Sequence, residues 1–250
     1  MKNRLKTQNV RKSQRLVTLI RTLLINQLTI LVFILALSSC SDFVEVDPPQ
    51  NILISEQIFD NPTTVESALA NIYFKIREQG MVSGRIGLST LMGAYSDDLD
   101  YYGFNADFLQ LYNHNVTATN TTILGWWSSA YNLIYSTNDI IAGVENSTSL
   151  NEADKERFRG QALFIRAYVH SLLVSIFGDI PYITTTDYLV NGSASRLSID
   201  LVFENLITDL ISAVNLLEGT QVTGERVLPS QSAALALLAR VYLYNENWEL

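Results

Sequence analysis

The amino-acid sequence predicts a mainly α-helical fold behind an N-terminal leader. Apolar residues recur at spacings of three and four along several long segments, as they do in amphipathic helices. Residues that start helices, such as Asn, Ser, Thr and Pro, precede these segments, and glycines follow most of them. Two segments rich in Ala and Leu also share a motif, which indicates a helical repeat.

The expected leader, a lipoprotein signal peptide, occupies residues 1–39. A basic stretch is followed by an apolar run, Leu28–Leu37, which is roughly half as long as a membrane-spanning helix. The next residues, Leu37-Ser38-Ser39-Cys40, resemble a bacterial lipobox, in which the cysteine thiol receives a diacylglycerol and becomes the new N-terminus. The alternative is a buried cysteine in an uncleaved helix. Residues 40–60, which include two adjacent prolines, are then expected to form a lipidated, extended tether.

The first helices of the folded region are predicted from capping patterns. A helix is expected from Asn61-Pro62 to near Gly80, with Thr63 and Glu66 spaced as a capping box. A short helix around residues 88–94 follows. The next segment, to about residue 120, carries glycines, asparagines and many aromatic residues, so it is predicted to be a long surface loop. Long loops of this kind are often functional.

The helical pattern returns over residues 122–145. A second capping box, Ser149-Leu150-Asn151-Glu152, opens a long helix that Gly178 and Pro181 end. Residues 182–197 then form a turn-rich connector. The connector leads to two more helices, one from the Ser198 cap to Gly219 and one from Pro229-Ser230 to Tyr244.

The second and the last of these helices contain similar motifs. The pattern A-L-(F/L)-x-R-(A/V)-Y begins at Ala162 and again at Ala236. This separation is close to two units of a helical-hairpin repeat of about 34 residues. Chance similarity between two Ala- and Leu-rich helices is the alternative explanation.

Composition and charge exclude several classes of function. The chain has 250 residues, 48% of them hydrophobic, which is enough for a sizeable core. Seven of the 17 basic residues and none of the 25 acidic residues lie in the leader, so the rest of the chain is strongly acidic. An acidic body binds phosphate backbones poorly, which disfavours nucleic acid as a partner. One cysteine cannot form an internal disulfide, a zinc cluster or a CxxC redox pair.

Six segments have the order and spacing of motifs found in one protein family, and they are spread over most of residues 40–250. They are the lipobox, "DPPQ", "NPTTVESALANIY", "WWSSAYNLIYSTNDII", "GQALFIRAYVHSLLVSIFGDIPY" and "LPSQSAALALLARVYLYNENWEL". With these segments the chain resembles the SusD/RagB family of outer-membrane lipoproteins of Bacteroidota.

The resemblance implies a fold, a location and a function. The fold is a helical scaffold with tetratricopeptide-like hairpins and an irregular remainder, here residues 61–250. Family members lie on the outer face of the outer membrane, bind glycans or other nutrient oligomers, and deliver them to a SusC-like TonB-dependent transporter. They are not enzymes, and we expect no cofactor. Family members usually run to about twice this length, so we expect an N-terminal portion that lacks the family's C-terminal half.

The best ligand-binding candidates lie in "YSDDLDYYGFNADFLQLY". Aromatic faces stack on the apolar faces of sugar rings, and carboxylates accept hydrogen bonds from sugar hydroxyls. The candidates are Asp97, Asp98, Tyr101, Tyr102 and Phe104. Alternatively, the aromatic rings cover the helical core and the acids are solvated. With Asp100, the two acids could also hold calcium, although no EF-hand spacing is present.

Other conspicuous residues are predicted to be structural. Trp126 and Trp127 follow a helical pattern, so the core is favoured over a sugar platform for Trp127. The two histidines, His114 and His170, have no second ligand or nucleophile at a catalytic spacing, so neither indicates a metal site or a hydrolase. The arginines of the two repeated motifs, Arg166 and Arg240, are expected to pair with buried carboxylates or to extend toward solvent.

Two other functions remain open at this stage. The chain could be a helical-repeat adaptor lipoprotein that binds a protein or a peptide. It could also be a secreted glycosidase, which would need two carboxylates about 5 to 10 Å apart in a cleft, but no motif supports this.

Overall fold

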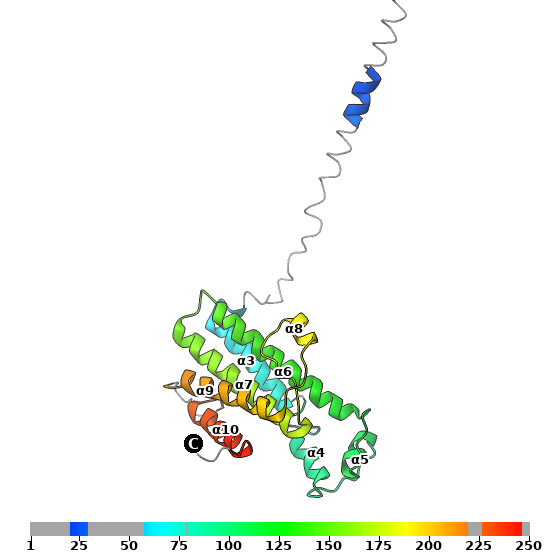
Figure 1. The fold of residues 1–250 in the computed structure, drawn as a ribbon, viewed down its shortest axis with the longest axis vertical. Helices are drawn as coiled ribbons and strands as arrows, with labels where there is room; N and C mark the ends of the chain where they lie inside the picture. Colours follow the sequence, from blue (N-terminus) through cyan, green and yellow to red (C-terminus); the bar gives the residue numbers. More distant parts are fainter. Residues whose placement is uncertain (1–20, 30–57, 79, 220–226, 247–250) are drawn as a thin grey trace, which may run out of the picture. The chain divides into compact units, whose positions relative to one another are not determined.

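The structure is a computed structural model, and it describes residues 21–29, 58–78, 80–219 and 227–246. Residues 1–52 and 53–250 form separate compact units. In the first unit, residues 21–29 form a helix within the predicted leader (Figure 1). Cys40, the lipobox and nearly all of the predicted tether lie outside the described residues, so their assignment stays a prediction.

The second unit is built from helices, as predicted. Within the described ranges, the only β pairing is an isolated antiparallel bridge between Ile180 and Leu197. The helices, shown in Figure 1, are α3 (Pro62–Glu78), α4 (Leu88–Tyr95), α5 (Ala106–Tyr112), α6 (Thr121–Asn146), α7 (Glu152–Phe177), α8 (Tyr188–Gly192), α9 (Ile199–Leu216) and α10 (Gln231–Tyr244).

The caps of two helices differ from the predicted capping boxes. Asn61, and not Thr63, caps α3, because its side-chain oxygen accepts a hydrogen bond of 3.1 Å from the Thr64 N–H. Asn151 caps α7 by accepting a bond of 2.9 Å from the Asp154 N–H. Asparagine is as good an N-cap as serine or aspartate, and in both places it stands directly before the first helical turn.

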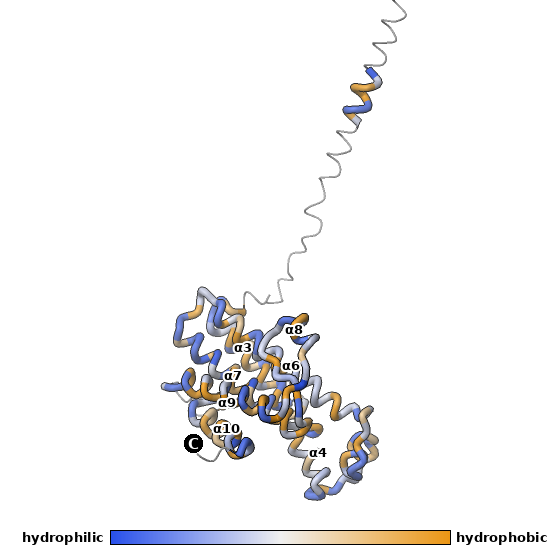
Figure 2. Tube along the Cα trace, viewed as in Figure 1, coloured by the Kyte–Doolittle hydropathy of each residue, from blue (hydrophilic) through white to orange (hydrophobic). Residues whose placement is uncertain are grey.

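Helices α6 and α7 form the centre of the unit and lie side by side (Figure 1). Helix α9 packs on α7, and α10 packs on α9. Apolar and polar residues are interspersed along these helices (Figure 2), as expected for helices that bury one face against their neighbours. Fully buried side chains such as Ile134, Phe158 and Leu206 fill the contacts.

Among the described helices, α7 alone is long and apolar enough to cross a membrane. Most of its apolar stretch is buried inside the unit, however. It is therefore the core helix of this unit.

A polar network links three helices and the connector through the core. Arg166 of α7 donates two hydrogen bonds to the Asp209 carboxylate of α9, at 2.8 and 2.6 Å, and a third to the Asn138 side-chain oxygen of α6, at 2.8 Å. The Tyr182 hydroxyl of the connector donates to Asp209 at 2.6 Å. The prediction that Arg166 pairs with a buried carboxylate is confirmed, whereas Arg240 is exposed on α10.

His170 is buried in the same region and has a structural role. Its Nδ1 lies 2.9 Å from the Arg166 carbonyl oxygen, and its Nε2 accepts a hydrogen bond of 3.2 Å from the Ile183 N–H. The ring stacks on Tyr182 at a centroid distance of 4.0 Å. This pattern fixes the neutral tautomer with the proton on Nδ1. Burial lowers the pKa of His170 to about 3.

We expect this histidine to make folding sensitive to acid. Its pKa is lower in the folded state than the ordinary value of about 6.5, so the unfolded chain binds the extra proton first. The stabilisation is complete above about pH 6.5 and is lost as the pH falls toward 3. Chemical denaturation at several pH values should show the wild type losing about 1.4 kcal/mol per pH unit relative to His170→Gln between pH 6 and 4. Parallel pH profiles for the two proteins would contradict this.

Candidate functional site

The segment predicted to be a long loop contains a second short helix. Helix α5 interrupts it, and the Asn105 side chain caps this helix by accepting a hydrogen bond of 3.0 Å from the Phe108 N–H. Asn120 joins α5 to the start of α6, because its amide donates to the Asp107 carbonyl oxygen and the Gln110 side chain at 3.0 and 3.1 Å. The expectation of a loop without helix was wrong. The short helix predicted around residues 88–94 is confirmed as α4, and it forms a helical pair with α5 at the N-terminal end of α6.

Helices α4 and α5 enclose a cavity with a volume of about 410 Å³. This volume lies within the range of about 300–1,000 Å³ typical of small-molecule pockets. Polar groups and apolar side chains both reach it. Its polar lining residues are Arg85, Thr90, Asp100 and Asn105.

Tyr101 forms part of the cavity wall and is the only one of the five candidate ligand-binding residues to do so. Its ring packs edge-on against Phe108 of α5, with centroids 5.7 Å apart. Its hydroxyl accepts a hydrogen bond of 3.1 Å from the Asn105 N–H. Gly103 lies so close to the Tyr101 ring that any side chain there would collide with it. The loop therefore fixes the Tyr101 ring in place.

Tyr102 and Phe104 instead project into solvent, with 86% and 97% of their surfaces exposed. They cover no part of the core, so the structural alternative considered for these aromatic residues is wrong at these two positions. The Tyr102 hydroxyl donates to Asp100 at 3.2 Å, and Tyr112 donates to the other oxygen of the same carboxylate. These hydrogen bonds to an anion raise the pKa of both tyrosines. Each phenol thus already gives its single O–H to the Asp100 carboxylate, which ties Tyr102 and Tyr112 to one acceptor.

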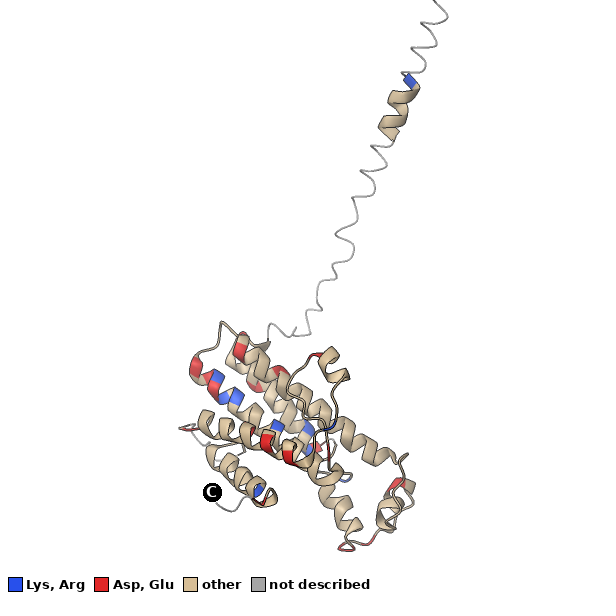
Figure 3. Cartoon of the chain, in the orientation of Figure 1, with Lys and Arg blue, Asp and Glu red and all other residues tan. Residues whose placement is uncertain are grey.

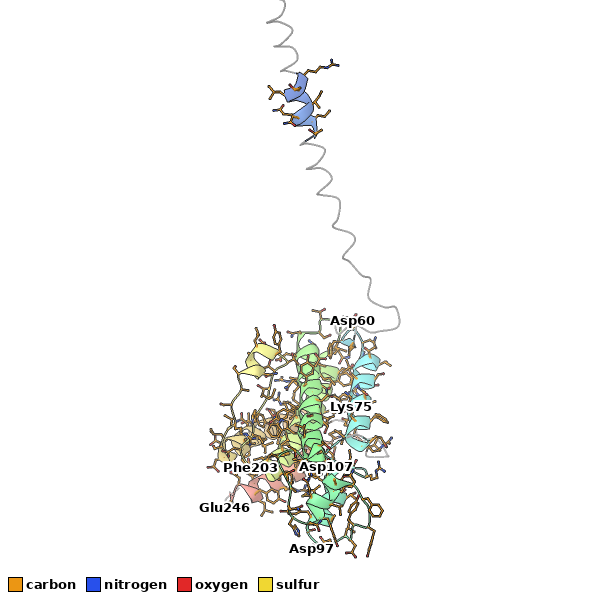
Figure 4. The ribbon with its side chains drawn as sticks, turned by 90° about the vertical axis from the view of Figure 1, so that its right-hand side faces the viewer. Asp60, Lys75, Asp97, Asp107, Phe203 and Glu246 are labelled. Carbon is orange, nitrogen blue, oxygen red and sulfur yellow. The ribbon has the colours of Figure 1, made fainter. Side chains whose placement is uncertain are left out.

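Asp97 and Asp98 lie in the turn after α4, outside the cavity lining. Asp97 adopts a left-handed backbone conformation, with φ of 62°, and Asp98 accepts a hydrogen bond of 2.8 Å from the Ser96 hydroxyl. Figure 4 shows Asp97 at one end of the unit. No group of three or more His, Cys, Asp or Glu side chains that could hold a metal ion occurs among the residues that the structure describes. The clustered acids thus give no support to a calcium site.

Arg85, Thr90 and Asn105 also line the cavity and are not among the residues predicted from the sequence. The signal for Asn105 was present, since "NADF" is an N-cap followed by a helical turn with an acid in it. No local pattern marks Arg85 and Thr90, because they reach the cavity only after the chain folds back on itself. The Trp126 indole N–H helps to hold this fold-back, as it donates to the Ile86 carbonyl oxygen.

The two adjacent tryptophans have different environments. Trp126 is buried in the core, with 1% of its surface exposed. Trp127, which was predicted to lie in the core, is partly buried: it packs against the core and also lines a second, smaller pocket. His114 ends the helical pair, where its ring packs edge-on against Tyr95 at 4.7 Å and its Nε2 contacts the Tyr95 carbonyl oxygen.

The lining of the cavity holds one basic and one acidic side chain, Arg85 and Asp100, so it carries no large charge of one sign. Helix α4 has no charged residue, and α5 has only Asp107, as Figure 3 shows. A neutral ligand with hydroxyl groups suits such a lining better than a strongly charged ligand does.

Comparisons with known proteins assign the fold to a family. A SusD-like family model, described as "Starch-binding associating with outer membrane", matches residues 42–243. The chain belongs to the SusD-like family. SusD-like protein P2 of Formosa agariphila is 30% identical over 230 residues, which cover 89% of this chain and 44% of that protein. A SusD-like protein of Bacteroides ovatus is 26% identical over 221 residues, covering 86% and 38% of the two chains. This SusD-like chain thus spans less than half the length of these relatives.

Solved structures share the fold of this SusD-like chain. A SusD-like carbohydrate binding protein from Bacteroides fragilis aligns with a TM-score of 0.65 and 22% identity, over 77% of this chain and 39% of that one. A SusD superfamily protein from Bacteroides vulgatus gives 0.64 and 26%, over 76% and 41%. A laminarin binding SusD-like protein gives 0.65 and 22%, over 74% and 41%. The predicted resemblance and the predicted helical fold class are both confirmed.

Proposed function

We propose that this SusD-like chain binds a glycan at the cell surface through the cavity between α4 and α5. The main support for this proposal is the arrangement of aromatic rings in and beside the cavity. A cavity of about 410 Å³ has the fixed Tyr101 ring in its wall, and the same loop holds two aromatic rings almost fully in solvent. Exposing Tyr102 and Phe104 gives up the burial that stabilises a fold, so their placement favours a role in binding.

The chemistry of the site suits carbohydrates. Sugar rings present apolar C–H faces, which stack on aromatic side chains, and hydroxyl edges, which need donors and acceptors. Tyr101, Tyr102 and Phe104 supply the faces, while Arg85 and Asp100 offer a donor and an acceptor. The family description names starch binding, and one structure with the same fold is described as laminarin binding, which supports a glycan as the ligand.

We also propose a lipid anchor that attaches the chain to the outer membrane and a transporter that receives the glycan. The lipobox at Leu37–Cys40 supports a lipid anchor, and the family description supports an outer-membrane location. The glycan would pass to a SusC-like TonB-dependent transporter, as the resemblance in sequence implies. Binding and hand-over involve no bond making or breaking, so the proposal assigns no catalytic residue and no cofactor.

Alanine substitutions in the aromatic loop test the glycan site. We expect Tyr101→Ala to weaken glycan binding at least tenfold, since it removes a ring from the cavity wall. Tyr102→Ala and Phe104→Ala should each weaken binding about two- to tenfold, as loss of one stacking contact does. The measurement is affinity electrophoresis of the purified chain through gels that contain amylopectin, laminarin or pectin.

Tyr244→Ala on α10 is the matched control, because Tyr244 is also exposed but lies outside the cavity lining. It should migrate like the wild type in every gel. If a glycan retards the wild type and all three loop variants equally, the site assignment is wrong. If no glycan retards the wild type, glycan binding itself is wrong, and the adaptor function becomes the better hypothesis.

A further inference from the structure

A second pocket lies on α6, between this helix and the connector that joins α7 to α9. Its volume is about 240 Å³. One wall is an aromatic row on α6, where Trp127, Tyr131 and Tyr135 follow one another at intervals of four residues. This spacing places the three rings on one face of the helix, over about 12 Å. Pro181 and Asn191 of the connector contribute to the opposite wall.

The deep end of the pocket is rigid. The Tyr131 hydroxyl donates a hydrogen bond of 2.8 Å to the Pro181 carbonyl oxygen, which ties the helix to the connector. The Trp127 ring lies 4.9 Å from the Tyr131 ring and 5.1 Å from the Phe177 ring. The Asn138 amide also donates to the Ile183 carbonyl oxygen at 3.1 Å. These contacts preform the pocket, so a ligand would not need to order it.

The outer end of the pocket offers an open aromatic face and unused polar atoms. Tyr135 exposes 51% of its surface, and its hydroxyl has no hydrogen-bond partner in the part of the chain that the structure describes. The Asn191 amide donates to the Thr185 carbonyl oxygen at 2.9 Å, which leaves its side-chain oxygen as an acceptor. Arg196 is not part of the pocket lining, but its guanidinium stands over the Trp127 ring, 5.4 Å from the ring centroid, and it donates one N–H to the Asp179 carbonyl oxygen. Its guanidinium has further N–H donors for a ligand.

The size and chemistry of the pocket limit the ligand. Its volume is below the usual range of about 300–1,000 Å³ for drug-sized molecules, so it suits a single ring. An exposed phenol face with an acceptor and a donor near it matches the apolar face and the hydroxyl edge of a sugar ring. A purely apolar ligand would leave the Asn191 oxygen without a partner, at a free-energy cost.

We propose that this pocket binds one ring of a glycan, as a second carbohydrate site apart from the cavity between α4 and α5. The inference rests on the proposed glycan-binding function and adds a site to it. A polysaccharide that engaged both sites would bind more tightly than either site alone allows, because the second contact becomes intramolecular.

The test is to count the glycan-binding sites on the chain with short oligosaccharides. The probes are maltohexaose and laminarihexaose, titrated calorimetrically into the purified full chain. Ala194→Trp should fill the pocket, since Ala194 lines it and is exposed, so that the larger side chain can be accommodated. Tyr135→Ala removes the open aromatic face. Tyr101→Ala disables the other cavity, and Tyr244→Ala is the control outside both.

We expect two sites in the wild type and in the control, and one site in Ala194→Trp and in Tyr101→Ala. Tyr135→Ala should weaken one of the two sites about two- to tenfold. A single site that Tyr101→Ala abolishes and Ala194→Trp leaves intact would overturn this inference but keep the proposed function. A single site that Ala194→Trp abolishes and Tyr101→Ala leaves intact would support the second pocket and refute the cavity between α4 and α5 as a glycan site. Absence of binding to the wild type by both probes would overturn this inference.

Discussion

Replacing Asp209 with alanine is expected to lower the free energy of unfolding by about 3–5 kcal/mol. Asp209 and Arg166 are 7% and 6% exposed, so the substitution leaves a buried guanidinium without its anion. The Tyr182 hydroxyl loses its acceptor in the same step. Because Tyr182 belongs to the connector, the variant should also loosen the wall of the second pocket that the connector forms. Chemical denaturation of the wild type and the variant measures the loss.

Two further variants test whether the loss of stability comes from leaving a buried charge unpaired, and not from breaking an ion pair as such. The double variant Arg166→Met with Asp209→Leu should recover part of the loss, because it leaves no buried charge unpaired. Glu66→Ala breaks the more exposed pair of Glu66 with Arg157, formed at 2.9 Å, and should cost less than about 1 kcal/mol. A cost for Asp209→Ala as small as that for Glu66→Ala would refute the central role given to the buried pair.

Replacing Cys40 with serine is expected to abolish lipid attachment and outer-membrane localisation of the chain. A serine hydroxyl is a far weaker nucleophile than a thiolate at neutral pH, so it should not accept the diacylglycerol. Stable anchoring takes more than one acyl chain, and the variant would carry none. Labelling with palmitate and fractionation of the membranes measure both losses. In the wild type, mass spectrometry should find Cys40 at the N-terminus, modified by lipid.

Ser39→Ala is the matched control, because it keeps a small residue before the cysteine and should preserve lipidation. Affinity capture of the lipidated wild type from outer membranes then tests the partner. Recovery of a TonB-dependent β-barrel would support delivery to a transporter. If Cys40→Ser still incorporated palmitate and remained in the outer membrane, the lipobox assignment would be wrong.

The helices that the sequence predicted best are those whose signals are local. Helix α9 begins after the predicted Ser198 cap, and α10 begins after Ser230 and ends at the predicted Tyr244. Caps and a period of 3.6 residues depend on neighbours in sequence, so they can be read without tertiary information. Helix α5 was missed because its seven residues are too short to show that period clearly.

The site could be predicted only as a region. The aromatic loop was found from its composition, but the inward position of Tyr101 and the outward positions of Tyr102 and Phe104 were not. That division depends on the close approach of Gly103 to the Tyr101 ring and on the hydrogen bond from the Asn105 N–H. Neither contact leaves a periodic trace in the sequence. A helical pattern alone also does not tell that Trp126 is the more deeply buried of the two adjacent tryptophans, since both contact the core.

The proposed glycan site is the cavity between α4 and α5. Hydrogen exchange of the backbone amides tests it most directly, measured with and without the oligosaccharide that binds the wild type most tightly. We expect slower exchange over residues 85–108 when the glycan is bound. Slower exchange confined to other parts of the chain, such as α10, or no change in exchange despite binding, would contradict it.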